Sequence, residues 1–373
     1  MNRLIIRFAI FVFALLPFCI KADNKIVQDT DPFRRNQRLR RTINLGNALE
    51  APMEGDWGMV IESEYFPTIK AAGFTAVRLP VRWAAHAKKD NPFLIDQSFL
   101  DRVKWVVDQS IQNDLAIVIN MHHYMDLFAS PLAHRERFIR IWQQIASYFR
   151  EAPEFVFFEL LNEPNSALDA NLWNQVLDEC TSVIRETNPD RTLIIGPSNW
   201  NHISADLDKL KLPDDNVILT VHYYEPFHFT HQGAEWVDNS DKWLGREWKG
   251  TSKQISKIES DFTKAAEWAN KNGVPVFLGE FGAYSKADEQ SRIKWTTAVR
   301  NHAEKYKFSW SYWEFGAGFG VYDRERNDWR GPLLNSLLPD HQSNYSRVSI
   351  VFSYRPCYLP NDHEINYFDS TFT

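Results

Sequence analysis

Two glutamates at the ends of apolar runs are the residues best placed to do chemistry. Glu163 follows the run 157–162, and Glu280 follows the run 276–279. A carboxylate after a buried strand lies where barrel enzymes hold their catalytic groups. Two such carboxylates can cleave a glycosidic bond, because one protonates the leaving oxygen while the other stabilises or attacks the anomeric carbon. A single glutamate is by default a solvated surface residue, so the hypothesis rests on the pair.

The elements that must position this pair are eight short apolar runs that alternate with amphipathic stretches. The runs are rich in β-branched and aromatic residues, which is typical of strands buried on both faces. They are Thr42–Leu45, Ala76–Leu79, Ala116–Met121, Phe155–Leu161, Thr192–Ile195, Val217–Val221, Val274–Leu278 and Ser309–Trp313. The stretches between them include Phe99–Gln112, Arg135–Phe149, Leu172–Glu186, Ser256–Asn270 and Glu289–Tyr306. This alternation predicts an α/β fold, a closed (β/α)8 TIM barrel with its site at the carboxyl ends of the strands.

The chain length suits one catalytic domain preceded by a targeting segment. Of the 373 residues, 44% are hydrophobic, and such a barrel fills about 250 residues. Residues 1–22 combine Arg3 and Arg7 with an apolar run, which predicts a secretory signal peptide; lipoprotein processing at Cys19 is an alternative that the bulky Phe18 disfavours. We expect the barrel at 23–341 and a tail of unknown role at 342–373. The product would be secreted, extracellular or periplasmic, with no membrane contact after signal removal.

Charge and cysteine content exclude several kinds of partner. The formal net charge is −6, and it becomes −9 without the signal peptide, whose charged residues are Arg3, Arg7 and Lys21. An acidic protein is a poor partner for nucleic acid. The other cysteines, Cys180 and Cys357, do not make a disulfide framework. We expect a monomer that needs no cofactor and binds a polysaccharide or oligosaccharide.

Polar and aromatic residues occur at nearly every expected strand end. They are Asn47, Glu50, Arg78, His122, His123, Asn162, Trp200, His222, Tyr224 and Trp313. A pyranose is bound by such polar groups together with stacked aromatic rings. Neighbouring residues on a strand point to opposite faces, and His122 and His123 have no partner at a metal-like spacing, so we expect no metal site. The long segment 225–252, with His231 and Trp236, predicts a loop that lines the substrate site.

Seven segments together resemble glycoside hydrolase family 5, and in particular its secreted endo-β-1,4-glucanases. The resemblance covers about residues 40–338 and is carried by Asn44–Glu50, Gly73–Arg78, Met121–Tyr124, Leu161–Pro164, Val221–Tyr224, Leu278–Gly282 and Tyr312–Gly316. It implies a retaining double displacement with Glu163 as general acid/base and Glu280 as nucleophile. Glu163 would then need a raised pKa and Glu280 a charged carboxylate. Retaining enzymes hold the two carboxyl groups about 5–5.5 Å apart.

The resemblance also implies roles for the other site residues. Asn162 would hold the 2-hydroxyl of the sugar, and Arg78 and Tyr224 would orient the nucleophile. His222 would lie near the acid/base, and Trp313 would stack under the sugar. The remaining residues would bind sugar hydroxyls or line the cleft: Asn47 and Glu50 on the glycone side, His122, His123, Trp200, His231 and Trp236.

Three functions remain open at this stage. The first is endo-cleavage of β-1,4-glucan, either cellulose-type or mixed-linkage. The second is cleavage of mannan, glucomannan or xyloglucan by the same residues, since the orientation of one sugar hydroxyl cannot be assigned from sequence. The third is a barrel that binds carbohydrate without cleaving it; loss of either carboxylate would be its signature, and both are present.

Overall fold

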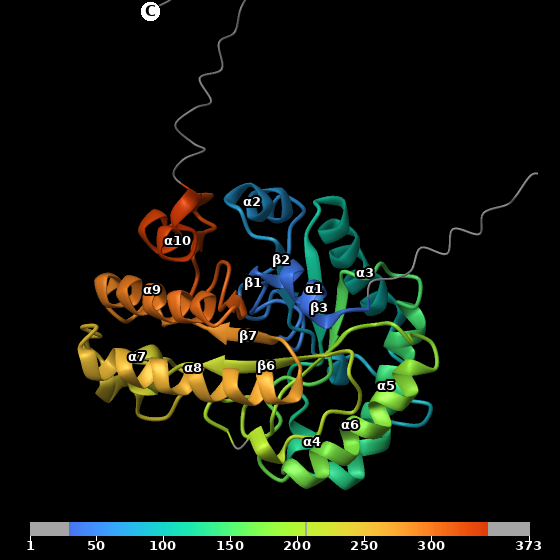
Figure 1. Cartoon of the computed structure of the whole chain (residues 1–373). Helices are drawn as coiled ribbons and strands as arrows, with labels where there is room; N and C mark the ends of the chain where they lie inside the picture. Colours follow the sequence, from blue (N-terminus) through green and yellow to red (C-terminus); the bar gives the residue numbers. More distant parts are fainter. Residues whose placement is uncertain (1–29, 206, 342–373) are drawn as a thin grey trace, which may run out of the picture.

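The computed structural model describes residues 30–205 and 207–341, which form a closed barrel of eight parallel strands (Figure 1). The strands pair in sequence order, and the last pairs with the first through the register Thr42↔Ser311. They are β1 (Arg41–Asn44), β2 (Ala76–Leu79), β3 (Ala116–Asn120), β4 (Val156–Glu159), β5 (Leu193–Ile195), β6 (Val217–Tyr223), β7 (Val276–Phe281) and β8 (Ser309–Tyr312). The predicted α/β barrel is confirmed. The predicted signal peptide, Cys357 and the tail lie outside the described residues.

Helices cover the outer face of the barrel, as Figure 1 shows for α8 and α9 beside β6 and β7. The helices are α1 (Pro32–Asn36), α2 (Tyr65–Ala72), α3 (Gln97–Gln112), α4 (Met125–Ala129), α5 (Pro131–Tyr148), α6 (Ala170–Arg185), α7 (Phe227–Thr230), α8 (Ser252–Asn272), α9 (Glu289–Lys305) and α10 (Gly331–Leu337). The longest, α8, begins at a capping box formed by Thr251 and Gln254 and ends where Gly273 adopts a left-handed conformation. A short hairpin of β9 (Tyr322–Asp323) and β10 (Asp328–Trp329) follows β8.

The barrel interior changes from apolar to polar along the strands. The half of the interior near the amino-terminal ends of the strands holds an apolar cluster. Its members include Leu39, Val118, Phe157, Ile218 and Phe277. Because inward-facing residues alternate along a strand, the next inward residue lies two positions further on. These next residues are polar and buried: Asn44, Arg78, Asn120, Glu159, Thr220 and Ser311. The apolar half therefore supplies packing, and the polar half supports the site at the carboxyl ends.

An irregularity in β7 decides where Glu280 points. Val221 pairs with Leu278 and His222 pairs with Glu280, so Gly279 is an extra residue in β7. The pairing of β7 with β8 is also irregular between Leu278 and Phe281. Such a bulge turns the strand locally and re-aims the next side chain. Glu280 thus lies inside β7 rather than after it, whereas Glu163 lies beyond the end of β4 at Glu159.

Candidate active site

A cavity of about 1280 Å³ opens at the carboxyl ends of the strands. The residues that line it include every predicted site residue except Arg78: Asn47, Glu50, His122, His123, Asn162, Glu163, Trp200, His222, Tyr224, His231, Trp236, Glu280 and Trp313. Arg78 is fully buried directly beneath, where it contacts Glu280. The sequence therefore identified one contiguous set of residues, although the role of each member stays a prediction.

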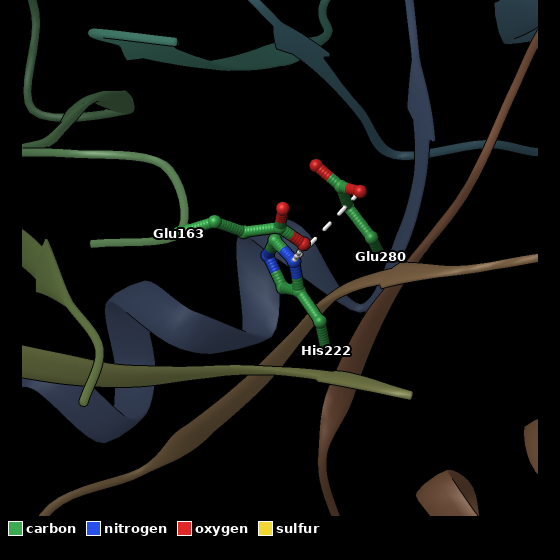
Figure 2. Close-up of side chains that lie close together, drawn as sticks. All are labelled: Glu163, His222 and Glu280. Atoms are coloured by element: carbon green, nitrogen blue, oxygen red, sulfur yellow. Dashed lines mark hydrogen bonds and ion pairs between the residues drawn. The ribbon is translucent and has the colours of Figure 1, made fainter. Parts of the chain in front are cut away.

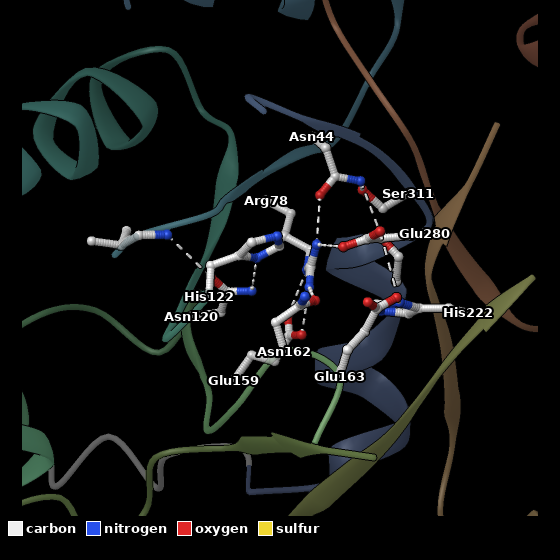
Figure 3. Close-up of polar contacts among 12 residues, drawn as sticks. Asn44, Arg78, Asn120, His122, Glu159, Asn162, Glu163, His222, Glu280 and Ser311 are labelled. Carbon is white, nitrogen blue, oxygen red and sulfur yellow. Dashed lines mark hydrogen bonds and ion pairs between the residues drawn. The ribbon is translucent and has the colours of Figure 1, made fainter. Parts of the chain in front are cut away.

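Arg78 connects the buried polar residues to the cavity floor (Figure 3). It donates from Nε and Nη2 to the two carboxylate oxygens of Glu159, both at 2.6 Å, and from Nη1 to Glu280 Oε1 at 2.7 Å. Asn44 and Asn162 accept its remaining hydrogen bonds, each at 2.9 Å. A guanidinium bound in this way has a pKa raised by the two carboxylates although burial opposes the rise. It is a fixed positive charge beneath Glu280.

Glu280 is held by two donors at once. Besides Arg78, the Tyr224 hydroxyl donates to Glu280 Oε2 at 2.9 Å. Burial raises the pKa of Glu280 above its ordinary value, while His222 and Arg78 oppose that rise. Hydrogen bonds donated to a carboxylate favour its charged form. The two donors therefore stabilise the ionised carboxylate that a nucleophile requires.

Glu163 lies in a different environment. Burial raises the pKa of its carboxyl to about 7, an effect that Arg78 opposes and Glu159 reinforces. Its side chain remains 28% exposed to the cavity, so solvent tempers the shift. No residue of the described chain donates a guanidinium or hydroxyl hydrogen bond to it; its partner is His222 Nδ1, 2.8 Å from Oε1. Glu163, whose pKa is about 7, can therefore act as an acid. Glu280, whose carboxylate accepts two hydrogen bonds, can act as a nucleophile.

The two carboxylates face each other across a short gap (Figure 2). One oxygen of Glu163, one oxygen of Glu280 and His222 Nδ1 all lie within 4.8 Å of one another. His222 Nδ1 is 3.7 Å from Glu280 Oε2. An approach of the two carboxylate oxygens to within 4.8 Å favours the close pair of retaining glycosidases, about 5–5.5 Å apart, over the roughly 6.5–9.5 Å of inverting ones.

The same three side chains offer the donor atoms that a metal ion would need. However, Arg78 already places a positive charge 2.7 Å from Glu280, where a cation would be repelled. Burial also lowers the pKa of His222 to about 4, and the neutral ring is already engaged with Glu163 at Nδ1. The arrangement fits two hydrogen-bonded carboxyls better than a metal centre.

The prediction that His122 and His123 face opposite sides is wrong. Their rings meet edge to face at 4.6 Å, and both line the cavity, because β3 ends at Asn120 and the two histidines lie in the following loop. The His122 ring stacks parallel to Trp313 at 5.7 Å. Burial lowers the pKa of both, to about 4 for His123, so they are neutral hydrogen-bonding groups at ordinary pH.

The long segment after β6 does line the cavity, as predicted. It contains α7 and a short turn of helix at Ser240–Trp243. His231 is stacked on Phe227 at 4.1 Å and meets Tyr224 at 4.9 Å. Trp236 is 61% exposed and touches Tyr284 edge to face at 5.0 Å. Trp236 therefore lines the cavity with most of its side chain exposed to solvent.

Several lining residues lay outside the sequence prediction. At the side of β1 and β8, Trp57 meets His123 at 5.7 Å, and Arg324 donates to the carbonyl of Gly58 at 2.7 Å. On the opposite side of the barrel the additional lining residues include Asn199 and His202, next to Glu225 and Phe227 of the predicted loop. A cavity lined from the loops after β1 and β8 to the loops after β5 and β6 can hold several sugar rings in a row.

Comparisons with known proteins identify relatives of this chain in sequence and in fold. The model of the family described as cellulase (glycosyl hydrolase family 5) matches residues 44–318. Endoglucanase H of Acetivibrio thermocellus is 36% identical over 329 residues, which is 85% of this chain but 35% of that protein. Two structures of Thermotoga maritima Cel5A, described as complexes with cellobiose and with mannotriose, superpose with a TM-score of 0.81 at 50% identity. In each case the match covers 82% of this chain and 100% of the other.

Proposed function

Because the chain belongs to glycoside hydrolase family 5, the cellulase family, we propose that it is an endo-acting, retaining β-1,4-glucanase. Glu163 is the general acid/base and Glu280 the nucleophile. The observation that supports this most directly is the approach of their oxygens to within 4.8 Å over an open cavity. The chain spans about a third of Endoglucanase H, so the activity is inferred from the site as well as from the relatives.

In the first step Glu280 attacks the anomeric carbon while Glu163 protonates the departing glycosidic oxygen. The C–O bond to the leaving sugar breaks, and an ester between Glu280 and the glycone forms. The donors from Arg78 and Tyr224 keep Glu280 ionised until it attacks. Glu163 is ready to give its proton because burial raises its pKa to about 7.

In the second step the charged Glu163 accepts a proton from water. The water attacks the same anomeric carbon, the ester bond breaks and Glu280 leaves as a carboxylate. Two inversions give a product with the original β configuration. A neutral His222, 2.8 Å away, can donate from Nδ1 to Glu163 while Glu163 carries its charge.

The surrounding residues position the sugar. The Oδ1 atom of Asn162 accepts from Arg78, which orients its Nδ2 donor for the 2-hydroxyl. Trp313 offers a ring face, and its parallel contact with His122 fixes the plane. Trp57 and Trp200, at opposite sides of the cavity, would hold rings farther from the cleavage point. This length favours attack within a polymer rather than at its end.

A second candidate activity is cleavage of β-mannan or glucomannan. It is favoured by the Thermotoga maritima Cel5A structure described as a complex with mannotriose. Both activities use the same two carboxylates, and they differ in how the cavity accepts the axial 2-hydroxyl of mannose.

Product analysis decides between these substrates. The purified protein is incubated with carboxymethyl cellulose, mixed-linkage glucan, glucomannan, galactomannan and xyloglucan, with Glu280→Gln as the control. We expect oligosaccharides of mixed length from the glucans and none from the control. If oligosaccharides are released from galactomannan alone, the activity is that of a mannanase and not of a glucanase. If the folded protein releases none from any of the polymers, the proposed activity is wrong.

We also propose that the protein is exported, with a barrel at 23–341. This rests on the charge and hydropathy of residues 1–22, which the structure does not describe. No helix in the described ranges is long and apolar enough to cross a membrane. Expression of the full chain in a secreting host, followed by amino-terminal sequencing of the product, tests it: a start at Asp23 is expected, and an intact Met1 would contradict it.

A further inference from the structure

Glu163 has a left-handed backbone, which is unusual for a glutamate. Its φ angle is +50°, in a region that residues other than glycine, asparagine and aspartate rarely adopt. The ring of Pro164, the next residue, restricts the backbone of Glu163 further. A backbone of this kind persists only where the surrounding structure holds it. The groups that hold the Glu163 backbone therefore also determine where its carboxyl lies.

One of these groups is the side chain of Asn201, which is completely buried in the loop after β5. Of the two orientations of its amide, one places the oxygen 3.1 Å from the backbone nitrogen of Glu163 and the nitrogen 2.9 Å from the carbonyl oxygen of Pro197. The opposite orientation would bring donor to donor and acceptor to acceptor, so the partners assign the first. No backbone carbonyl of the described residues accepts from the Glu163 N–H. The Asn201 amide therefore provides the acceptor for this N–H.

The backbone of Asn201 holds the partner of Glu163. Its carbonyl oxygen accepts from the N–H of His222 at 2.7 Å, and Nδ1 of the His222 ring lies 2.8 Å from Glu163 Oε1. Asn201 is itself left-handed, with φ +48°, a conformation that asparagine tolerates better than most residues. Asn201 thus connects the main chains of Glu163 and His222, which come from the loop after β4 and from β6.

A glycine makes room for the Asn201 amide. Gly196 directly follows β5. A Cβ atom on Gly196 would lie 2.7 Å from Asn201 Cγ and 2.8 Å from the carbonyl oxygen of Thr220. The Asn201 side chain therefore packs directly on the backbone at the end of β5, and this packing fixes its position together with its hydrogen bonds.

We propose that Asn201 is a positioning residue for the acid/base: its amide holds the backbone of Glu163 so that the carboxyl reaches the glycosidic oxygen. The proposal rests on the proposed role of Glu163. Asn201 does not line the cavity, so it acts through Glu163 and not on the sugar. Without the amide, the Glu163 N–H loses its acceptor and the left-handed backbone relaxes. The carboxyl then leaves the position that proton transfer requires.

The test compares two aryl cellobiosides in Asn201→Gly. Glycine removes the amide and adopts the left-handed backbone of residue 201 without strain. A phenyl leaving group needs a proton from Glu163, whereas a 2,4-dinitrophenyl group leaves without one. We expect kcat/KM for the phenyl cellobioside to fall roughly 10- to 100-fold, since a displaced acid transfers its proton less well. For the dinitrophenyl cellobioside kcat/KM should change by less than about 3-fold.

Turnover of the activated substrate gives a second signature. Release of the dinitrophenyl group is fast, so kcat reports the second step, in which Glu163 acts as base. In Asn201→Gly, kcat and KM for this substrate should therefore fall together. A residue that only stabilised the fold would lower kcat/KM for both substrates alike. Equal losses on the two substrates, or no loss on either, would overturn the proposal.

Asn188→Gly is the matched control, because it makes the same substitution at another buried asparagine. Asn188 is 4% exposed, its Nδ2 donates to the carbonyl oxygen of Ala146 at 2.8 Å, and it does not line the cavity. The ratio of the two kcat/KM values should stay at its wild-type value in this variant. If the ratio changes as in Asn201→Gly, the effect belongs to any buried amide and the proposal is overturned.

A measurement on the wild-type protein does not depend on the variants. Because Asn201 accepts its hydrogen bond, the backbone amide hydrogen of Glu163 should exchange slowly with solvent deuterium, as followed by nuclear magnetic resonance. Exchange at the rate of an unprotected amide would overturn the proposal.

The Glu163→Ala variant, assayed with the same two cellobiosides, separates this proposal from the proposed function. If kcat/KM falls equally on both substrates, Glu163 is not the acid and the proposed function fails. If Glu163→Ala spares kcat/KM for the dinitrophenyl cellobioside alone while Asn201→Gly leaves both values unchanged, only the role of Asn201 fails.

Discussion

Arg78 donates from Nη1 to Glu280 at 2.7 Å while its Nε and Nη2 atoms are both held by Glu159 at 2.6 Å. One guanidinium therefore balances two buried carboxylates, of which Glu280 alone lines the cavity. The charge state of Glu280 thus depends on Glu159, a residue that no substrate reaches.

Glu159→Gln tests this dependence. The amide removes one negative charge, so Arg78 favours ionised Glu280 more strongly and the raising effect of Glu159 on the pKa of Glu163 disappears. Both pKa values should fall, and both limbs of the kcat/KM profile should move to lower pH. The loss of charge-assisted hydrogen bonds should also lower stability by about 1–3 kcal/mol. Limbs that stay in place in a folded variant would show that Glu159 has no electrostatic effect on the pair.

Activity should follow a bell with pH. A nucleophile must be charged, so activity is lost as pH falls through the pKa of Glu280. An acid must be protonated, so activity is lost as pH rises through the pKa of Glu163, about 7. Because the two carboxyl groups interact, the apparent pKa values of the two limbs belong to the pair and not to either residue alone. If the alkaline limb persisted in Glu163→Ala with an activated substrate, this limb would report the titration of a group other than Glu163.

Glu163→Ala should respond to azide. An activated aryl leaving group needs no proton, so the glycosyl-enzyme still forms, and azide replaces the water that Glu163 would have activated. We expect faster turnover with added azide and a β-glycosyl azide as product, identified by nuclear magnetic resonance. If azide does not speed turnover, or if the product is an α-glycosyl azide, the assignment of Glu163 as acid/base and Glu280 as nucleophile is wrong.

Trp236→Ala should weaken polymer cleavage. An indole that stacks on a sugar contributes about 1–3 kcal/mol, so kcat/KM on a long oligosaccharide should fall roughly 5- to 150-fold, with little effect on a short aryl glycoside. Trp243→Ala is the matched control, because Trp243 belongs to the same loop, packs on Phe227 and His228, and does not line the cavity. Equal losses on both substrates together with a lower Tm would mean that Trp236 only packs the loop.

The barrel was predictable because each strand is a short apolar run buried on both faces. What the runs do not encode is how neighbouring strands pair. Gly279 is recognised as an extra residue of β7 only from the pairing of β7 with Val221 and His222 of the neighbouring strand β6. The end of β3 at Asn120 likewise decides that His122 and His123 share the cavity. Register and strand ends depend on tertiary pairing, which a single strand does not reveal.

The polar residues at the carboxyl ends of the expected strands were predictable, whereas Glu159, inside the expected strand Phe155–Leu161, was not. Glu159 lies within an apolar run, so the sequence predicts a strand residue there and not a site residue. A buried charge in such a run must be paired with another group. Its partner Arg78 is 81 positions away in sequence, so the pair becomes visible only in three dimensions. Trp57 and Arg324 come from loops, whose course over the barrel has no periodic signature.

The central claim is that Glu280 forms the covalent intermediate. The most direct measurement is peptide mass spectrometry after incubation with a 2-deoxy-2-fluoro cellobioside that carries a 2,4-dinitrophenyl leaving group. The fluorine slows both steps by destabilising the positive transition state, and the good leaving group restores the first, so the ester accumulates. The account predicts one added disaccharide on the peptide that contains Glu280, and none in Glu280→Gln. A label on Glu163, or an inverted product with no label, would contradict it.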